Sequence, residues 1–205
     1  MNNSTVFNSP AEASQWLKQG NLLAYPTESV WGIGCDAYDE QAVKAILAIK
    51  NRPINKGMIV ATDSADRVTS LLKPLSTVQR NLILASWQPH DSHQARQAHT
   101  WLLPISTGSQ SIPKWITGRH NSVAVRVIAH PLIRELCASL VSEINPYGFL
   151  VSTSCNPSGQ PPATTLNEAM AYFAHDANVT FLQGDTLGYE LPSQIRDAVT
   201  GKVIR

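Results

Sequence analysis

Three cationic side chains lie within seven residues of this sequence, at Lys50, Arg52 and Lys56. Two ammonium groups and one planar guanidinium could clamp the phosphates of a nucleotide, since a guanidinium binds phosphate through two parallel hydrogen bonds. The same cations could instead only stabilise the C-terminal end of a helix, where the helix dipole favours positive charge. Spacing alone leaves both interpretations open.

Two other segments carry hydroxyl and amide side chains, and in the first of them these side chains follow the end of an apolar, extended stretch. Residues 150–159 read Leu-Val-Ser-Thr-Ser-Cys-Asn-Pro-Ser-Gly, and residues 192–197 read Pro-Ser-Gln-Ile-Arg-Asp. Such side chains often only cap a turn, but they can equally line a nucleotide or phosphate pocket. No Ser-His-Asp or Cys-His arrangement can be assigned from residue order, so the sequence offers no covalent nucleophile.

A third segment, residues 22–36, combines a strand with a polar turn and two glycines. Pro26 fixes φ and lacks an N–H, so the strand must stop there, before Thr27. Gly32 and Gly34 permit either a close backbone approach or a positive φ. Loops at strand ends are where open α/β sheets bind ligands, although an ordinary turn is the simpler alternative.

Together these segments resemble the YrdC family. Six motifs follow the family's order, at residues 25–36, 50–57, 100–104, 122–127, 152–159 and 192–197. The resemblance covers nearly the whole chain. It implies the synthesis of threonylcarbamoyl-AMP from L-threonine, bicarbonate or CO2 and ATP, with release of pyrophosphate. The product would serve the threonylcarbamoyladenosine modification of tRNA next to the anticodon.

The resemblance also implies which side chains bind each substrate. The ATP-binding residues would be Lys50, Arg52, Thr100, Ser152, Ser154, Asn156, Ser193 and Arg196. The residues for threonine or bicarbonate would be Thr27, Lys56 and Arg126. ATP is expected as a substrate together with Mg²⁺, and no protein-bound structural metal is expected. Cys155 stands where the family usually has alanine, so we interpret it as a small neutral residue.

The implied partners are the tRNA threonylcarbamoyl-transferase proteins, and any binding of tRNA itself is expected to be weak and steeply salt-dependent. The alternative function is a non-catalytic RNA-binding or ribosome-maturation factor. Such a factor would use the concave face that the resemblance implies for the fold. The hydroxyl-rich residues 152–154 and Ser193 favour the enzyme, because a pure RNA binder would need cations there.

Composition supports one domain over residues 1–205, since 43% hydrophobic content can form a substantial core. A net charge of +1 argues against a protein that coats nucleic acid. The three cysteines lack a Cys-x-x-Cys pair, so neither a disulfide framework nor a zinc knuckle is indicated. No signal peptide or membrane-spanning run is found, which predicts a cytoplasmic protein without a membrane partner.

Strands and helices alternate along the chain, which predicts an α/β fold. The resemblance implies a single twisted, mixed β-sheet flanked by helices, with a concave basic face. We expect strands at residues 21–25, 57–61, 100–104, 122–128, 149–153, 179–182 and near 202–204. We expect helices at residues 10–19, 39–50, 64–72, 76–86, 131–140 and 166–174. Ser9 and Glu12 form a capping box for the first helix, which Gly20 ends.

One connection departs from the family, where a tight Trp-Pro-Gly-Pro-x-Thr turn is common. Here residues 88–99 separate Trp87 from Thr100, and the glycine is missing. We expect residues 88–98 to form an exposed, mobile loop while Thr100 keeps its place, because added loop length costs little entropy. The alternative is a lid over the site.

Overall fold

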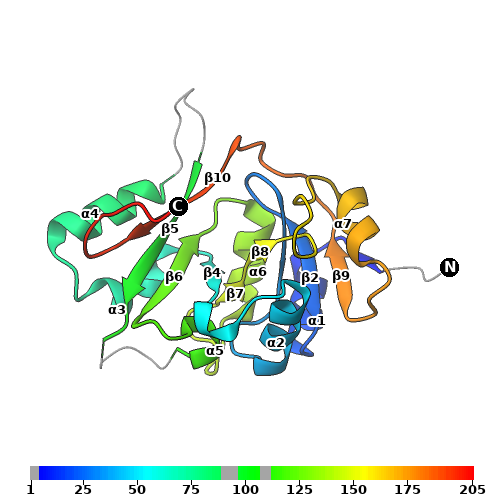
Figure 1. Ribbon diagram of the computed structural model, residues 1–205, viewed down its shortest axis with the longest axis horizontal. Coiled ribbons are helices and arrows are strands. Elements are labelled where there is room, and N and C mark those ends of the chain that lie inside the picture. The colour runs from blue at the N-terminus through cyan, green and yellow to red at the C-terminus, as the bar shows by residue number, and fades with distance from the viewer. Residues whose placement is uncertain (1–4, 89–96, 107–111) are drawn as a thin grey trace.

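The structure, a computed structural model, describes residues 5–88, 97–106 and 112–205. Two five-stranded mixed sheets stand side by side, with helices on their outer faces (Figure 1). Sheet A has the order β1-β9-β2-β3-β8, and sheet B has the order β10-β5-β6-β4-β7. The strands of sheet A are β1 (Val6–Phe7), β2 (Leu22–Pro26), β3 (Trp31–Gly34), β8 (Thr153–Ser154) and β9 (Val179–Leu182). The strands of sheet B are β4 (Ile59–Thr62), β5 (Gln97–Pro104), β6 (Ser122–Val127), β7 (Leu150–Val151) and β10 (Leu191–Asp197).

The described α-helices are α1 (Pro10–Lys18), α2 (Glu40–Ile49), α3 (Thr69–Leu72), α4 (Thr77–Ser86), α5 (Lys114–Thr117), α6 (Pro131–Leu140) and α7 (Leu166–Phe173). Two short 3-10 helices are η1 (Ile54–Lys56) and η2 (Ala65–Val68). The predicted N-cap of α1 is confirmed, because the Glu12 N–H donates to Ser9 Oγ, and Gly20 follows the helix with a φ of +82°. The full capping box is not formed, since the Glu12 carboxylate accepts from Ser9 Oγ at 2.9 Å instead of from the Ser9 N–H. Asp39 and Thr165 cap α2 and α7 in the same way, and Ser76 forms a capping box on α4.

The two sheets are joined where one extended segment changes partners. β7 pairs antiparallel with β4 in sheet B, and β8 pairs antiparallel with β3 in sheet A. Ser152 lies between them, and its N–H donates to the carbonyl of Ile59 at 2.9 Å. The expectation of a single sheet is therefore corrected, because the strand predicted at residues 149–153 crosses from one sheet to the other at Ser152.

The glycines of β3 allow close packing against this strand, including that of the segment that crosses between the sheets. A Cβ on Gly34 would stand 1.8 Å from the carbonyl oxygen of Val151, and one on Gly32 would stand 2.9 Å from the Tyr25 ring. Neither glycine has a positive φ. Close approach is thus the correct interpretation of these two glycines: the backbone of Val151 comes close to Gly34, and the Tyr25 ring comes close to Gly32. The sequence analysis took this stretch as a turn and missed β3.

The hydrophobic core is shared by both sheets. One buried cluster contains Trp31 of sheet A together with Trp101 and Val125 of sheet B. A second cluster, beneath α1 and α6, includes Leu17 and Leu136. The cleft described below is therefore bounded by elements that pack on common cores.

Several expectations for individual elements need correction. β1, α5 and β10 were not predicted, and the strand expected near residues 202–204 is only an isolated bridge between Val203 and Arg196. β5 begins at Gln97, within the loop expected at residues 88–98. Residues 89–96 of that loop lie outside the described part of the chain.

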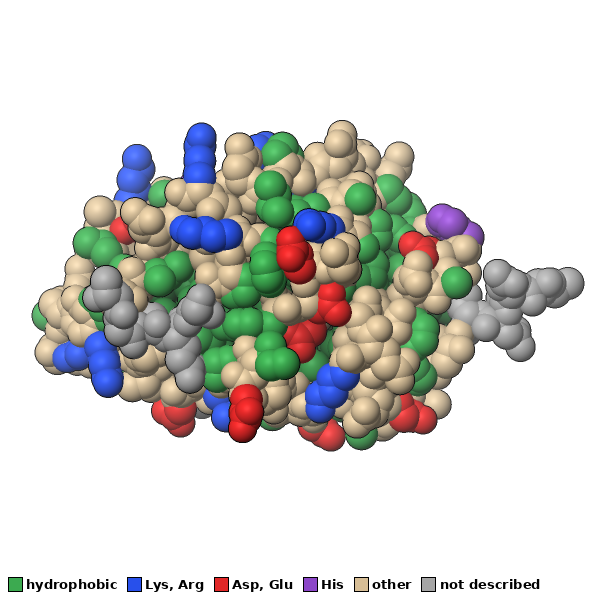
Figure 2. All heavy atoms as spheres, turned by 90° about the horizontal axis from the view of Figure 1, so that it is seen from below, with side chains coloured by type: hydrophobic (Ala, Val, Ile, Leu, Met, Phe, Trp, Pro, Cys, Tyr) green, Lys and Arg blue, Asp and Glu red, His purple; other side chains and the backbone are tan. Residues whose placement is uncertain are grey.

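Acidic and basic side chains are interspersed on the face seen in Figure 2. The basic character of the concave face stays a prediction. Within the described residues, no helix combines the length and the apolar character needed to span a bilayer.

Candidate active site

Three hollows adjoin one another, starting at the crossing of the two sheets. The first, the crossing cleft, has a volume of about 640 Å³ and is lined from both sheets. The second, the sheet pocket, has about 410 Å³, and the third, the cationic hollow, has about 420 Å³. The crossing cleft and the sheet pocket share Ile59, Ser152, Thr153 and Arg205. The sheet pocket and the cationic hollow share Arg52, Lys56 and His120, whereas the first and third hollows share none of their described lining residues.

Eight of the residues that line the crossing cleft carry a hydroxyl group. Its hydroxyl-bearing residues are Thr27, Ser29, Ser152, Thr153, Ser154, Thr164, Tyr189 and Ser193. Thr27 follows β2, where Pro26 ends the strand, and its Oγ1 donates to the Val30 carbonyl at 2.7 Å. The cleft therefore offers many neutral hydrogen-bonding groups from four separate segments of the chain.

One buried cation faces this cleft. Arg126 of β6 is only 8% exposed, and its Nη2 forms an ion pair with the carboxylate of Glu28. Glu28 is itself buried, and its Oε1 accepts a hydrogen bond from the Ala129 N–H at 2.8 Å. Burial lowers the pKa of Arg126 to about 10, so this side chain keeps its charge at neutral pH. The Nε of Arg126 is buried and has no hydrogen-bond partner.

Lys50 and Asn156 support the loop that follows β8. The Lys50 Nζ donates to the Asn156 carbonyl at 2.7 Å, to Asn156 Oδ1 at 2.8 Å and to the Ser154 carbonyl at 3.0 Å. Asn156 in turn donates to the carbonyls of Pro157 and Gln160. Burial lowers the pKa of Lys50. Neither side chain lines the three hollows, but together they fix Ser154, which lines the crossing cleft.

The sheet pocket has an apolar floor and a cationic rim. The floor consists of strand residues Ile59, Leu102, Ala124 and Ile195. The polar rim consists of Arg52, Lys56, His120, Ser122 and Arg205. Such a surface suits a flat apolar group that carries negative charge at one end.

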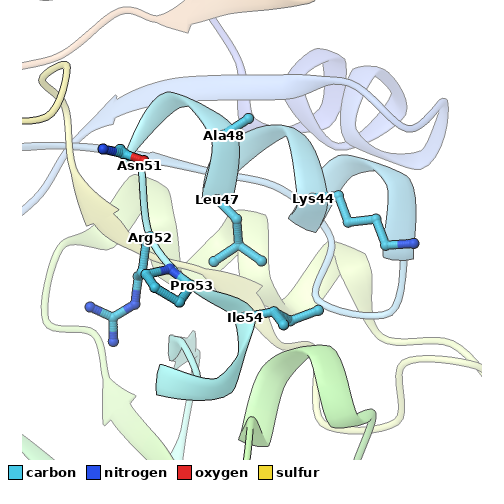
Figure 3. A pocket seen from close by; sticks show the side chains of 7 residues that line it. All are labelled: Lys44, Leu47, Ala48, Asn51, Arg52, Pro53 and Ile54. Atoms are coloured by element: carbon cyan, nitrogen blue, oxygen red, sulfur yellow. The ribbon is translucent and has the colours of Figure 1, made fainter.

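Arg52 is held in a fixed orientation on this rim. Its Nε and Nη2 both donate to the Gly57 carbonyl, at 3.0 and 2.8 Å. Burial, and then the charge of Arg205, lower the pKa of Arg52. Figure 3 shows the Arg52 guanidinium pointing away from Lys44 and α2. The hollow drawn there, of about 370 Å³, shares only Arg52 with the sheet pocket.

Besides Lys50 and Asn156, two further predicted ATP-binding residues do not line the three hollows. Thr100 is fully buried opposite Arg126 in the strand register, and its hydroxyl has no hydrogen-bond partner. Arg196 lies over the ring of Trp101, with 5.9 Å between Cζ and the ring centroid. Because side chains alternate along a strand, Arg196 and Ile195 of β10 face opposite sides of the sheet.

Arg205 and Glu28 were missed by the sequence analysis. Arg205 reaches both pockets because residues 204–205 lie along β10, where the Ile195 N–H donates to the Arg205 carbonyl at 2.9 Å. The strand expected near residues 202–204 was the only signal for this position. No group of three or more His, Cys, Asp or Glu side chains suited to a metal ion occurs in the part of the chain that the structure describes.

Comparison with known proteins finds one matching family model and several relatives that carry the same name. Residues 15–205 match the Sua5/YciO/YrdC family, which carries the description "Telomere recombination". The chain is 60% identical over 207 residues to "Threonylcarbamoyl-AMP synthase" of Psychrobacter arcticus, covering 98% of this chain and 97% of the relative. It is 42% identical over 192 residues to the protein of the same name from Moraxella catarrhalis, covering 94% and 92%.

Two solved structures share the fold. P. abyssi Sua5, solved in complex with L-threonine, matches with a TM-score of 0.73 and 25% identity over 95% of this chain. That match spans 54% of the P. abyssi protein, so this chain corresponds to about half of it. E. coli YciO matches with a TM-score of 0.73 and 19% identity, covering 98% of this chain and 95% of its own.

Proposed function

The chain belongs to the Sua5/YciO/YrdC family, and we propose that it makes threonylcarbamoyl-AMP from L-threonine, bicarbonate or CO2 and ATP. This reaction would make it a nucleotidyltransferase. The observation that carries the proposal is the meeting of two chemically different pockets at Ser152 and Arg205. One is lined by hydroxyls with a buried arginine, and the other has an apolar floor with a cationic rim. The name of the P. arcticus relative supports the same reaction.

We assign threonine to the crossing cleft. The Arg126 guanidinium suits the α-carboxylate, because a charge-assisted pair in a buried site is strong and directional. Thr27 lies at the same cleft and offers a hydroxyl to the amino acid. Lys56 lines the sheet pocket beside Arg52, so its position favours the phosphates of ATP over threonine.

We assign ATP to the sheet pocket. The nucleoside would cover the apolar floor, while Arg52, Lys56 and Arg205 neutralise the phosphates. Ser152, at the junction of the two pockets, and Ser154 and Ser193, in the adjoining cleft, would bind the nucleotide near its α-phosphate.

The remaining predicted ATP-binding residues would not contact the substrates themselves but would support residues that do. Lys50 and Asn156 would hold the loop that carries Ser154. Thr100 would support Arg126, which it faces across the strand pair. At the C-terminal segment the geometry favours Arg205 over Arg196 as the cation that faces ATP.

The chemistry then needs no covalent enzyme intermediate. The threonine amine combines with CO2, or with bicarbonate and loss of water, to give a carbamate. A carbamate oxygen attacks the α-phosphorus from the crossing cleft, and the bond from that phosphorus to the bridging oxygen breaks. The electron pair of this bond leaves with pyrophosphate. Orientation and charge neutralisation by the residues above supply the rate enhancement.

Mg²⁺ would accompany ATP in this proposal. The cationic rim and the hydroxyls fit a polyphosphate that brings its own metal, since Mg²⁺ is usually held by substrate phosphates and water. Bound Mg²⁺ would neutralise charge that develops on the phosphates.

The product would be passed to the tRNA threonylcarbamoyl-transferase proteins, with tRNA itself bound weakly. A cytoplasmic location fits the three cysteines, which are free and buried. A purely RNA-binding role gains no support from the hydroxyl-lined cleft.

Pyrophosphate release from ATP, measured without RNA, tests the proposal. We expect release only when L-threonine and bicarbonate are both present, with far less when L-serine replaces threonine. Pyrophosphate release that does not depend on threonine, or no release under any condition, would contradict the proposed reaction.

A further inference from the structure

A fourth hollow, the α2 hollow, lies at the C-terminal end of α2 (Figure 3). It has a volume of about 370 Å³. The reaction proposed above uses only Arg52 among its lining residues, and none of the described side chains that line it is acidic. Its lining residues are Lys44, Leu47, Ala48, Asn51, Arg52, Pro53 and Ile54.

The α2 hollow combines an apolar surface with a cation at one end. Leu47, Pro53 and Ile54 supply the apolar surface, and Lys44 extends beyond Ile54 (Figure 3). Ile54 is 44% exposed, so part of this surface faces solvent. Lys44 pairs with Glu40 of the same helix, but such an exposed pair contributes little, so Lys44 can exchange its partner at low cost. The hollow therefore suits an apolar side chain that stands next to a carboxylate.

The loop between α6 and β7 presents such a pair of side chains. Ile144 is 74% exposed, and Glu143 before it is exposed as well. The next residue, Asn145, is buried and anchors the loop. Its Nδ2 donates to Asp36 Oδ1 and to the Phe149 carbonyl, each at 3.0 Å, and its Oδ1 accepts from the Phe149 N–H at 2.8 Å. Because Ile144 is held in place by its neighbour, little conformational entropy would be lost when it binds a partner.

This loop and the α2 hollow lie at opposite ends of α2. Asn145 contacts Asp36, whose carbonyl accepts from the N–H of Asp39, and Asp39 caps the start of the helix. The α2 hollow lies at the other end, and a helix of ten residues is about 15 Å long. Ile144 therefore does not fill the hollow of its own chain.

A second copy of the chain can bring the two features together. If the α2 helices of two copies run antiparallel about a two-fold axis, the start of each helix meets the end of the other. Each Ile144 then meets the α2 hollow of the other copy, and each Glu143 meets a Lys44. The exposed residues Ala45 and Ala48 have short side chains, which allow two helices to approach closely. Such a contact is self-complementary and closes at two copies.

We propose that this chain forms a two-fold dimer in which Ile144 of each copy occupies the α2 hollow of the other. Ile144 is the anchor of the contact, because burial of a large apolar side chain in a hollow contributes more than an exposed ion pair. The pair between Glu143 and Lys44 sets the orientation. The proposal does not depend on the reaction, since the crossing cleft shares no described lining residue with the α2 hollow.

Sedimentation velocity of the full chain over a range of concentrations tests the dimer. We expect the wild type to shift from monomer to dimer as the concentration rises. Ile144→Ser and Ile54→Ser should each raise the dimer Kd by at least about tenfold, because each removes apolar surface from the contact. Val78→Ser is the matched control, since Val78 is 79% exposed on α4, and it should leave the Kd unchanged. Circular dichroism checks that each variant is folded.

Disulfide trapping tests the predicted pair of contacting residues. The variant Ile144→Cys/Ile54→Cys should form a covalent dimer on mild oxidation, because a disulfide requires Cα atoms within about 7 Å of each other. The three native cysteines are free and buried, so they should not contribute. The control Val78→Cys/Ile54→Cys should stay monomeric on a non-reducing gel.

Two results would overturn the proposal: a wild type that stays monomeric at every concentration, or a dimer whose Kd is unchanged in Ile144→Ser. The first would leave the α2 hollow to a different protein or to none. Both are distinct from a failure of the proposed function, which is measured by pyrophosphate release. Ile144→Ser should release pyrophosphate at the wild-type rate, because the contact is separate from the crossing cleft.

Discussion

At the scale of single residues, the Glu28 carboxylate sets the position of the cation that we assign to threonine. It contacts Arg126 through one oxygen and the Ala129 N–H through the other. Its backbone carbonyl also accepts from the Tyr189 N–H at 2.8 Å, and Tyr189 lines the crossing cleft. Glu28 therefore joins β6, the start of α6 and the segment before β10.

Glu28→Gln keeps the shape of this side chain and removes its charge. Arg126 would then be a buried cation without a counter-ion, so the free energy of unfolding should fall by about 3 kcal/mol. The KM for threonine should rise by about tenfold while the KM for ATP changes little, because only the crossing cleft is disturbed. Steady-state kinetics with each substrate varied in turn measure both.

The matched control is Glu143→Gln, which removes an exposed carboxylate and should match the wild type. Equal changes in both KM values for Glu28→Gln would contradict a role specific to threonine.

Arg52 offers a second test at this scale. Arg52→Lys keeps the positive charge and loses the Nε and Nη2 hydrogen bonds to the Gly57 carbonyl. The kcat/KM for ATP should fall by about tenfold or more, since a flexible ammonium cannot replace an anchored planar fork. Arg67→Lys, in a surface ion pair with Asp63, is the control and should keep wild-type kinetics. Wild-type kinetics for Arg52→Lys would reject the anchored-fork role.

At the scale of elements, the crossing at residues 150–154 positions the junction of the two pockets. It depends on β3 coming so close that the Val151 carbonyl oxygen would be 1.8 Å from a Cβ on Gly34. The Tyr25 hydroxyl donates to the same carbonyl at 3.1 Å. Ser152 is consequently fixed by packing from both sheets.

Gly34→Ala tests this close approach. The added methyl group cannot fit, so the segment must shift, and the free energy of unfolding should fall by about 3 kcal/mol or more. Gly159→Ala is the control, because a Cβ there meets nothing within 4 Å and only its φ of +85° is unfavourable. That control should cost about 1 kcal/mol. Urea unfolding compares the two, and equal losses would show that β3 is not tightly packed on the crossing.

Sequence reasoning predicted the elements whose signals are local. α1, α2 and α4 follow from apolar periodicity and N-terminal capping residues, and each lies within two residues of its expected bounds. β3 was missed because its glycines serve tertiary packing, which no local pattern reveals. β10 was missed because residues 192–197 read as a polar turn motif rather than as a strand.

The same distinction applies to the candidate site. Thr27, Ser152 and Ser193 were predicted from the family resemblance, and they do line one cleft. Arg205 reaches the pockets only because residues 204–205 pair with β10, a strand that the sequence did not predict. The alternation of side chains on β10 separates Arg196 from the cleft, and this could not be seen before the strand was known.

At the scale of the whole molecule, both sheets pack on the same cores, and we propose that the chain folds as one domain. Trp31 of sheet A and Trp101 of sheet B lie in one buried cluster. Neither sheet would keep its apolar face covered if the other unfolded. Unfolding should therefore be a single cooperative event.

Urea unfolding followed by tryptophan fluorescence and by far-ultraviolet circular dichroism tests this expectation. The two probes should give coincident transitions with one midpoint. Separate midpoints would mean that the sheets unfold as independent units. Saturating ATP should move the midpoint upward, because a ligand that binds only the folded state stabilises it.

Identification of the reaction product tests the central claim most directly. The protein is incubated with ATP, L-threonine and ¹³C-bicarbonate. The adenylate products are then separated, and their masses are measured by mass spectrometry. We predict an AMP adduct that contains threonine and one ¹³C-labelled carbonyl carbon, formed in step with pyrophosphate. An adduct without the label, or threonyl-AMP in its place, would contradict the assignment of a carbamate that attacks the α-phosphorus.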